Sequence, residues 1–305
     1  MQPLATTAPQ LVSLSAPDEI APQRRIGRWA AAAVLILLAA FVAYTLFTNS
    51  NLNHRAIGHF LLSAAILHGL TVTIELAVIS QAAGMLFGLL VALLRLSQNP
   101  VARTVGAAYV WLFRGTPLLV QILIWGNFAL FYKHLTIGIP GTSWTLASYN
   151  TNHILTAFVA SLLALSLNEA AYMAEIIRGG LLSVDPGQHE AARAMGLSPA
   201  QTLRKVVLPQ ALRVIIPPSG NQFISMLKMT SLVSVIAGGD LLTQAENISA
   251  ANLRTMELLL VASAWYLLVT TVASIGQSLL ERRFNRGHSR TGSGRFTRVR
   301  QGQPA

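Results

Sequence analysis

Six apolar segments, each long enough to cross a membrane as a helix, constrain the fold of this 305-residue chain most strongly. A hydrocarbon core of about 30 Å requires roughly 20 helical residues. The segments cover residues 29–48, 69–94, 105–132, 154–177, 209–237 and 258–280. The composition agrees, because 53% of all residues are apolar and only 11% are charged, unlike a soluble globular domain. The sequence therefore predicts an all-α membrane protein with about six transmembrane helices.

The distribution of basic residues predicts the orientation of the chain. With a cytoplasmic N-terminus, 17 of the 22 Lys and Arg residues lie on the cytoplasmic side, three on the opposite side and two within spans. Cytoplasmic loops of membrane proteins carry an excess of Lys and Arg, so both termini are expected in the cytoplasm. The net charge of +11 is thereby explained without a nucleic-acid partner. We expect disordered tails at residues 1–28 and 285–305, the second lying against anionic membrane lipid.

A charged stretch between the fourth and fifth segments, residues 185–209, contains two helix-start signals. Asp185, Pro186 and Gln188 form a pattern typical of an N-terminal capping box, and Ser198, Pro199 and Gln201 repeat it. Gly196 is expected to end the first helix in the left-handed conformation, and Leu208-Pro209 to end the second.

Such a structure is longer than a linker requires, because helix-to-helix connections usually take 2 to 8 residues. We therefore expect residues 185–209, called here the two-helix loop, to bind another protein, although a plain connection between spans remains the alternative. Ala191, Ala192 and Met195 share one helix face that a partner groove could accept, flanked by Glu190 and Arg193.

Several motifs resemble one known family. Glu190-Ala191-Ala192, followed by Gly196 and by Leu208-Pro209, is similar to the EAA loop of binding-protein-dependent ABC importer permeases; Val206 stands where that motif usually has Ile. Residues 113–118, 172–180, 209–213 and 228–232 resemble the polar amino acid branch of the family. The likeness covers roughly residues 68–284, and family members commonly have a five-span core. The resemblance thus implies a permease domain at residues 61–284, preceded at residues 29–60 by an extra N-terminal span and an external loop.

The resemblance also implies a function: import of polar amino acids, or close analogues such as opines, across a bacterial inner membrane. The chain would pair with a second permease copy or a paralogue. It would receive solute from a periplasmic or extracellular substrate-binding protein, and would couple to cytoplasmic ATPase subunits that bind ATP and magnesium. The chain itself has no P-loop motif, so ATP hydrolysis is expected from a partner, and no catalytic residue or cofactor is expected in this chain. Its histidines show no paired ligand spacing, so no metal site is expected either. The coupling residues implied are Asp185, Glu190, Ala191, Ala192, Gly196, Leu208 and Pro209.

An ion-coupled secondary amino acid transporter is the alternative. It would also have buried charges and six or more spans, but it would not require the two-helix loop, and no inverted repeat is evident. A channel would be active without nucleotide. ATP-dependent uptake therefore separates the importer from both alternatives.

Polar residues within the spans are candidates for the substrate path, because an unpaired charge at the bilayer centre costs several kcal/mol. The candidates are Glu75, Asn168, Glu169, Asn221, Gln222 and Lys228. Glu169 could meet a substrate ammonium group, pair with Lys228, or cap a helix break. Residues 217–222, which begin with Pro217-Pro218, are expected to interrupt the fifth span, either as a packing kink or as a break that exposes polar backbone groups. Arg114-Gly115-Thr116-Pro117 is expected to interrupt the third span.

Overall fold

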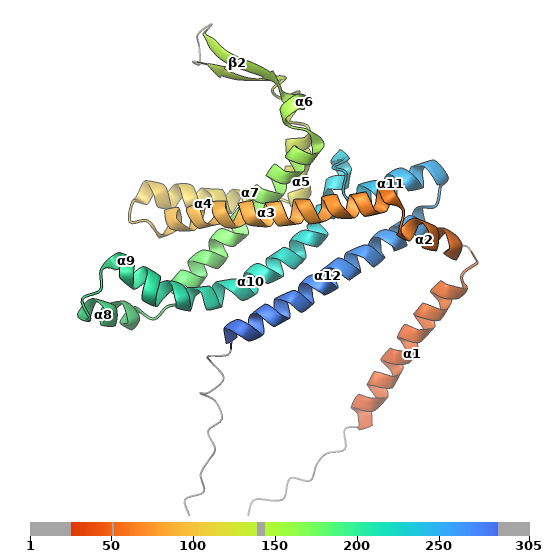
Figure 1. Ribbon diagram of the computed structural model, residues 1–305, viewed down its shortest axis with the longest axis horizontal. Coiled ribbons are helices and arrows are strands. Elements are labelled where there is room, and N and C mark those ends of the chain that lie inside the picture. Colours follow the sequence, from red (N-terminus) through yellow and green to blue (C-terminus); the bar gives the residue numbers. More distant parts are fainter. Residues whose placement is uncertain (1–25, 51, 139–143, 286–305) are drawn as a thin grey trace, which may run out of the picture. The chain divides into compact units, whose positions relative to one another are not determined.

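The computed structural model describes residues 26–50, 52–138 and 144–285, and these residues are almost all helical (Figure 1). The chain divides into two units, Met1–Leu52 and Asn53–Ala305. The first unit contains α1 (Ile26–Thr48), which covers the first predicted span. Most of the two predicted tails, residues 1–25 and 286–305, lies outside the described residues.

The second unit contains the remaining elements. Its first half consists of α2 (His54–Leu61), α3 (Ala64–Leu96), α4 (Pro100–Gly115), α5 (Leu118–Gly126), the 3₁₀ turn η1 (Phe128–Leu130), β1 (His134–Gly138), β2 (Thr145–Asn150) and α6 (Thr151–Ile154). Its second half consists of α7 (Ala157–Leu182), α8 (Pro186–Ala194), α9 (Pro199–Thr202), the π-helical turn η2 (Leu203–Val207), α10 (Leu208–Met229), the 3₁₀ helix η3 (Thr230–Ile236), α11 (Leu241–Asn252) and α12 (Thr255–Asn285).

Three helical segments of the second unit are individually long and apolar enough to span a membrane: Ala64–Leu96, Ala157–Leu182 and Thr255–Arg283. Two bent pairs pass the same test together, α4 with α5 at 97° and Pro199–Ile236 with α11 at 44°. Trp29–Phe41 in α1 is a shorter apolar helix. The described residues thus support an all-α membrane protein with three to five candidate spans, and the total of six stays a prediction.

The two bends test the predicted interruptions. The bend between α4 and α5 falls at Thr116-Pro117, as predicted. The predicted interruption at Pro217-Pro218 is wrong, because α10 continues through both prolines to Met229. The chain breaks instead after Ile236, where Ala237 has a φ of 54° and Gly239 a φ of 83°. Gln277 of α12 donates to the Pro217 carbonyl at 2.8 Å, so a neighbouring helix supports α10 at the proline pair.

A short β-hairpin between α5 and α7 has no counterpart in the sequence predictions. β1 and β2 pair antiparallel, with His134 opposite Asn150 and an irregularity between Ile137 and Gly138. Because both strands are short and their described side chains are mostly exposed, the apolar periodicity that marks spans does not reveal them.

Close packing of α3 against α7 forms the centre of the second unit. Gly84 and Gly88 are spaced as in a GxxxG motif, and both face α7. A side chain at Gly88 would lie 2.7 Å from Met173 Cβ and 2.9 Å from the Ala170 carbonyl oxygen, so the two backbones approach as closely as glycine allows. One apolar core cluster, which includes Val91, Met173 and Ile215, joins α3 and α7 to α10.

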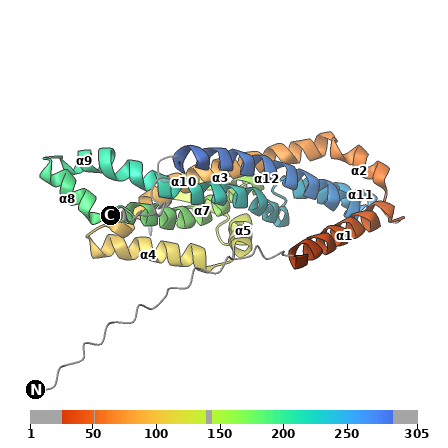
Figure 2. The same cartoon turned by 90° about the horizontal axis from the view of Figure 1, so that it is seen from below.

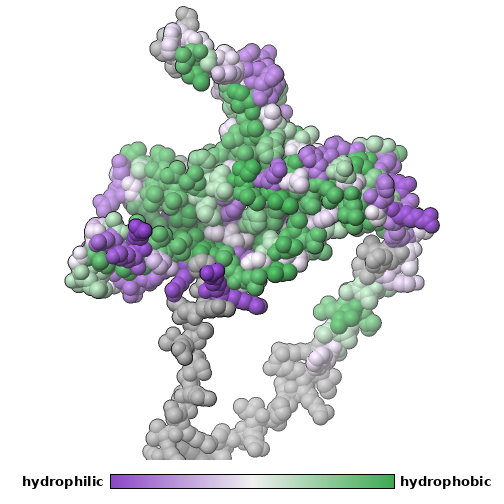
Figure 3. Space-filling view, in the orientation of Figure 1, coloured by the Kyte–Doolittle hydropathy of each residue, from purple (hydrophilic) through white to green (hydrophobic). Residues whose placement is uncertain are grey.

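Polar side chains gather at the ends of the second unit. Figures 1 and 2 both place α8 and α9 at one end and α2 with α11 at the other. In Figure 3 apolar side chains cover much of the region between these ends, whereas hydrophilic side chains gather over the α8–α9 end and the α2–α11 end. This distribution is the one expected of a helical unit that crosses a bilayer.

Candidate functional site

The first helix of the two-helix loop is capped, although not by the predicted capping box. Asp185 Oδ1 accepts a hydrogen bond from the Gly187 amide at 2.6 Å, and Pro186 occupies the first helical position. The Gln188 side chain does not reach back to Asp185. Its Oε1 accepts from Gln210 Nε2 at 3.4 Å, which ties α8 to α10 across the loop.

The turn between the two helices follows the prediction. Gly196 has a φ of 75°, a conformation that glycine adopts without strain. The Gly196 amide donates to the Arg193 carbonyl at 2.9 Å and the Leu197 amide to the Ala192 carbonyl at 3.1 Å, the pair of bonds that defines a Schellman motif. Ser198 and Gln201 then form a complete capping box at the start of α9.

The predicted end of the second helix at Leu208-Pro209 is wrong. The chain passes from α9 through the π-turn η2 directly into α10, with the Leu208 amide bonded to the Leu203 carbonyl. Pro209 has no amide hydrogen and its ring would clash with a carbonyl one turn earlier, so the wider turn relieves a conflict that would otherwise end the helix. Gln210 Nε2 donates to the Val206 carbonyl at 3.0 Å. The second half of the loop and the following span are therefore one continuous helical segment.

The exposed face of α8 differs from the predicted face. Glu190 and Ala191 are exposed and Met195 is 80% exposed, but Ala192 is buried and faces the interior of the loop. A cavity of about 180 Å³, lined in part by His189, Arg193 and Leu203, separates α8 from the π-turn. Glu190, Ala191 and Met195 therefore form the surface of α8 available to a partner.

Asn168 supports the bend between α4 and α5. Its Nδ2 donates to the Phe113 carbonyl at 2.9 Å and to Gln121 Oε1 at 3.3 Å. Gln121 Nε2 in turn donates to the Thr116 carbonyl at 3.2 Å and to Phe113 O at 3.0 Å. A helix that stops before a proline leaves its last carbonyl groups without backbone donors. The side-chain amides of Asn168 and Gln121 donate hydrogen bonds to these carbonyl groups in their place. Gln121 was not among the sequence candidates.

Glu169 of α7 lies buried against α3 at Gly84 and against α10 at Gln222. Its Oε2 accepts from Gln222 Nε2 at 3.2 Å, while Oε1 has no hydrogen-bond partner among the described residues. Lys228 forms no ion pair with Glu169 in the described part of the chain, so the predicted alternative of that pair is not found. The structure thus brings Glu169 and Gln222 together and leaves one carboxylate oxygen unpaired.

The two ion pairs of Glu175, one to α3 and one within α7, were not among the sequence predictions. Glu175 of α7 pairs with Arg95 at the end of α3 and, at 2.9 Å, with Arg178. Arg114 lies over the Tyr172 ring, 5.0 Å from its centre. The Arg178 pair follows from the three-residue spacing on one helix, but Arg95 is eighty residues away, and only the fold shows that contact.

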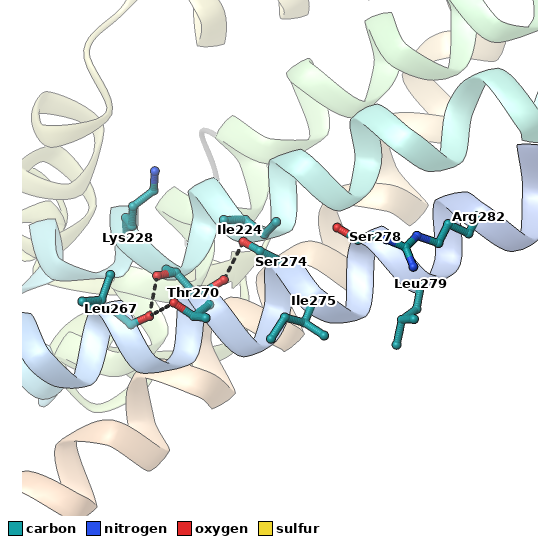
Figure 4. Close-up of a pocket in the computed structure, with 10 residues that line it drawn as sticks. Ile224, Lys228, Leu267, Thr270, Ser274, Ile275, Ser278, Leu279 and Arg282 are labelled. Carbon is teal, nitrogen blue, oxygen red and sulfur yellow. Dashed lines mark hydrogen bonds between the residues drawn. The ribbon is translucent and has the colours of Figure 1, made fainter. Parts of the chain in front are cut away.

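Lys228 lines a groove of about 640 Å³ between α10 and α12. Figure 4 shows the lysine on α10 and hydroxyl side chains along α12, among them Thr270, Ser274 and Ser278. Thr270 and Ser274 donate to carbonyls of their own helix at 2.7 Å, which leaves oxygen lone pairs facing the groove. Arg282 lies at the end of the row. The cationic groups suit a carboxylate ligand, whereas the Thr270 and Ser274 oxygens can accept hydrogen bonds from a cationic part of a ligand.

Glu75 and Asn221 lie apart from these clusters. Glu75 is exposed on α3 and Asn221 on α10, and neither lines the groove. Among the described residues there is no group of three or more His, Asp or Glu side chains that could hold a metal ion.

A bundle of apolar helices with bent spans, a few buried polar side chains in its apolar core and a capped loop at one end is the architecture of a membrane transport subunit. Residues 84–286 match the family of binding-protein-dependent transport system inner membrane components, and the chain belongs to that family. It is a transport component, not an enzyme.

Curated relatives of the same family are similar over most of the chain. The arginine transport system permease protein ArgU of Corynebacterium glutamicum is 40% identical over 90% of this chain and 85% of its own length. The octopine transport system permease protein OccM of Rhizobium radiobacter is 37% identical, covering 71% of this chain and 84% of OccM.

Among solved structures, the crystal structure of an amino acid ABC transporter with histidines includes a chain with 38% identity and a TM-score of 0.61. The match covers 72% of this chain and 94% of that one. The fold thus has a counterpart in an amino acid ABC transporter.

Proposed function

We propose that this protein is the permease subunit of an ATP-driven importer for polar amino acids or close analogues such as opines. The similar proteins named above are permeases for arginine and octopine, and the solved relative belongs to an amino acid transporter. Both solutes combine a carboxylate with cationic groups. The groove lined by Lys228 offers cationic groups, and Glu169, which is buried and does not line that groove, offers a carboxylate.

The two-helix loop is the proposed contact with the ATPase. One observation carries this assignment: α8, a capped helix with an exposed face, is joined by a short glycine turn to α9, and α9 continues through the π-turn into the span α10 without a break. A movement of α8 would therefore reach α10 through the hydrogen bonds of the turn, the continuous helix from α9, and the contact of Gln188 with Gln210. Glu190, Ala191 and Met195 face the partner, whereas Asp185, Gly196, Leu208 and Pro209 set the loop geometry, and Ala192 packs behind the contact surface.

The assembly requires further partners. A cytoplasmic ATPase pair would bind ATP and magnesium, a second permease copy or a paralogue would complete the path, and a periplasmic or extracellular binding protein would deliver the solute. The excess of basic residues on the side of the two-helix loop favours cytoplasmic termini. The proposed substrate path includes Lys228, Glu169 and Gln222. Glu75 and Asn221 are exposed in this chain, and they would line the path only if a second permease subunit covers their side chains.

A substitution of Gly196 tests the docking assignment. A side chain at this position would meet no atom within 4 Å, so the effect of a substitution comes from the positive φ alone. Gly196→Val should strain the turn by about 1–2 kcal/mol and weaken co-purification of the cognate ATPase subunit roughly tenfold. Gly196→Asn, which tolerates the left-handed conformation, is the control and should bind nearly normally. Unchanged ATPase binding by the Val variant would count against the two-helix loop as the docking site.

The solute class is tested with the complete transporter in liposomes, together with its binding protein. ATP hydrolysis should rise when arginine, another polar amino acid or octopine is supplied, and uptake should stop when ATP is withheld. Uptake driven by an ion gradient without ATP would support the secondary transporter instead. Stimulation by apolar amino acids alone would overturn the proposed solute class but leave the ATPase contact intact.

A further inference from the structure

An open pocket of about 570 Å³ lies where α3 ends, α4 begins and α7 ends. Three guanidinium groups line it, one from each helix: Arg95, Arg103 and Arg178. Ser97 and Thr104 add hydroxyl groups to the lining. The proposed solute groove lies elsewhere, between α10 and α12, and shares no residue with this pocket.

The positive charge of this pocket is only partly compensated. Glu175 pairs with both Arg95 and Arg178, whose side chains are about a quarter exposed. Arg103 is exposed and pairs with no carboxylate in the described part of the chain. Three guanidinium groups therefore share one carboxylate, and the pocket keeps an excess of two positive charges. Such an arrangement attracts an anion with several oxygen acceptors.

An apolar cavity adjoins the cationic pocket. It holds about 300 Å³ and is lined by Pro100, Val101, Thr104 and Val105 on the outer side of α4. Thr104 lines both cavities. Val101 is 69% exposed and Val105 is 56% exposed, so this side of α4 presents apolar surface directly beside the arginines.

The position of the two cavities favours a phospholipid over a free anion as the ligand. The pocket lies at the C-terminal end of the span Ala64–Leu96, the depth at which a bilayer changes from hydrocarbon to headgroups. A free phosphate ion would use only the cationic part. A phospholipid with an anionic headgroup uses both parts, with its phosphate at the arginines and an acyl chain along Val101 and Val105.

We propose that this pocket binds one anionic phospholipid, with its headgroup at Arg95, Arg103 and Arg178. The site is independent of solute import and of ATPase docking. The bound lipid would contact the end of α3, the start of α4 and the end of α7. Residues 183 and 184 connect α7 to the two-helix loop. The bound headgroup also supplies the negative charge that the three guanidinium groups lack.

Native mass spectrometry of the full-length chain in detergent tests the site. Phosphatidylglycerol and phosphatidylcholine with identical acyl chains are titrated against the wild type. We expect phosphatidylglycerol to bind at least fivefold more tightly. Arg103→Gln should reduce that affinity roughly fivefold, the change expected for one arginine near a membrane surface. Arg213→Gln removes an exposed arginine of α10 that does not line the pocket, and it should change the affinity less than twofold.

Two further measurements separate the lipid from a free anion. Val101→Ser with Val105→Ser should weaken phosphatidylglycerol binding, because it removes the apolar part of the site. Millimolar inorganic phosphate should not displace the lipid. Equal binding of the two lipids, equal effects of the Arg103 and Arg213 variants, an unaltered affinity in the double Val variant, or complete displacement by phosphate would each overturn the proposal.

Discussion

The contact of α3 with α7 allows a quantitative test of the fold. In Gly88→Ala the new Cβ would lie 2.7 Å from Met173 Cβ, 2.9 Å from the Ala170 carbonyl oxygen and 3.0 Å from the Ala174 amide nitrogen. Two of these three atoms belong to the backbone of α7, so a change of rotamer cannot relieve the contact. The helices have to separate locally.

The size of the separation gives the expected loss of stability. Reaching the 3.4 Å at which ordinary contact begins requires about 0.7 Å of movement from the present 2.7 Å. A gap of about 0.5–1 Å removes roughly a quarter to a half of the attraction between the packed atoms it separates. Overpacking of this kind costs about 1–3 kcal/mol. We expect Gly88→Ala to lower the free energy of unfolding by about 2 kcal/mol and the melting temperature by about 4–8 °C.

The measurement is thermal unfolding of the purified chain in detergent, followed by tryptophan fluorescence. Gly179→Ala is the matched control, since Gly179 also lies in α7 and a side chain there would meet nothing within 4 Å. Alanine favours the helix over glycine by about 1 kcal/mol, so this control should melt at or above the wild-type temperature. If Gly88→Ala melts no lower than Gly179→Ala, the close approach of α3 and α7 is refuted.

The same unfolding assay checks three more predictions, at Leu253, Asp240 and Glu175. Leu253→Gly should raise the melting temperature by about 2–4 °C, because Leu253 is 89% exposed and has a φ of 59° that glycine adopts without strain. An unchanged or lower melting temperature would contradict this reasoning. Asp240→Ala should cost about 1–2 kcal/mol, because Asp240 accepts from the Leu242 and Thr243 amides at the start of α11, and Asp240→Asn, which keeps a capping oxygen, should cost less. Glu175→Gln should cost about 1–3 kcal/mol of unfolding free energy by leaving Arg95 and Arg178 without their carboxylate. Adding Arg95→Gln should restore part of the loss. If the losses of the two single variants simply add in the double variant, the ion pair between Arg95 and Glu175 is contradicted.

Local signals in the sequence predicted the elements whose structure depends on neighbouring residues. Gly196, Ser198 and Gln201 adopt the expected turn and cap because their backbone bonds are made within the loop itself. The bend at Thr116-Pro117 was predicted for the same reason. Pro217-Pro218 has the same local chemistry but does not end its helix, since packing against α12 and the bond from Gln277 maintain it. Tertiary contacts decide between the two outcomes, and the sequence pattern does not contain them.

For the candidate polar residues, too, the sequence showed local features but not tertiary contacts. Their presence inside spans was visible in the sequence, but their partners were not. Asn168 satisfies carbonyls at the bend and Glu169 meets Gln222. These contacts join residues more than fifty positions apart, which no periodicity can indicate. A signal that was available is the spacing of Gly84 and Gly88, which indicates the close helix contact.

The π-turn before α10 has a mechanical consequence. Leu208 and Lys228 lie on one helix and are twenty residues apart, a distance of about 30 Å at 1.5 Å per residue. If the helix pivots at the π-turn by about 10°, Lys228 is displaced sideways by about 5 Å, roughly the rise of one helical turn. A small rotation at the two-helix loop is thus amplified by the length of α10, so Lys228 and the side of the groove that it lines can move by several ångströms while the loop itself moves little.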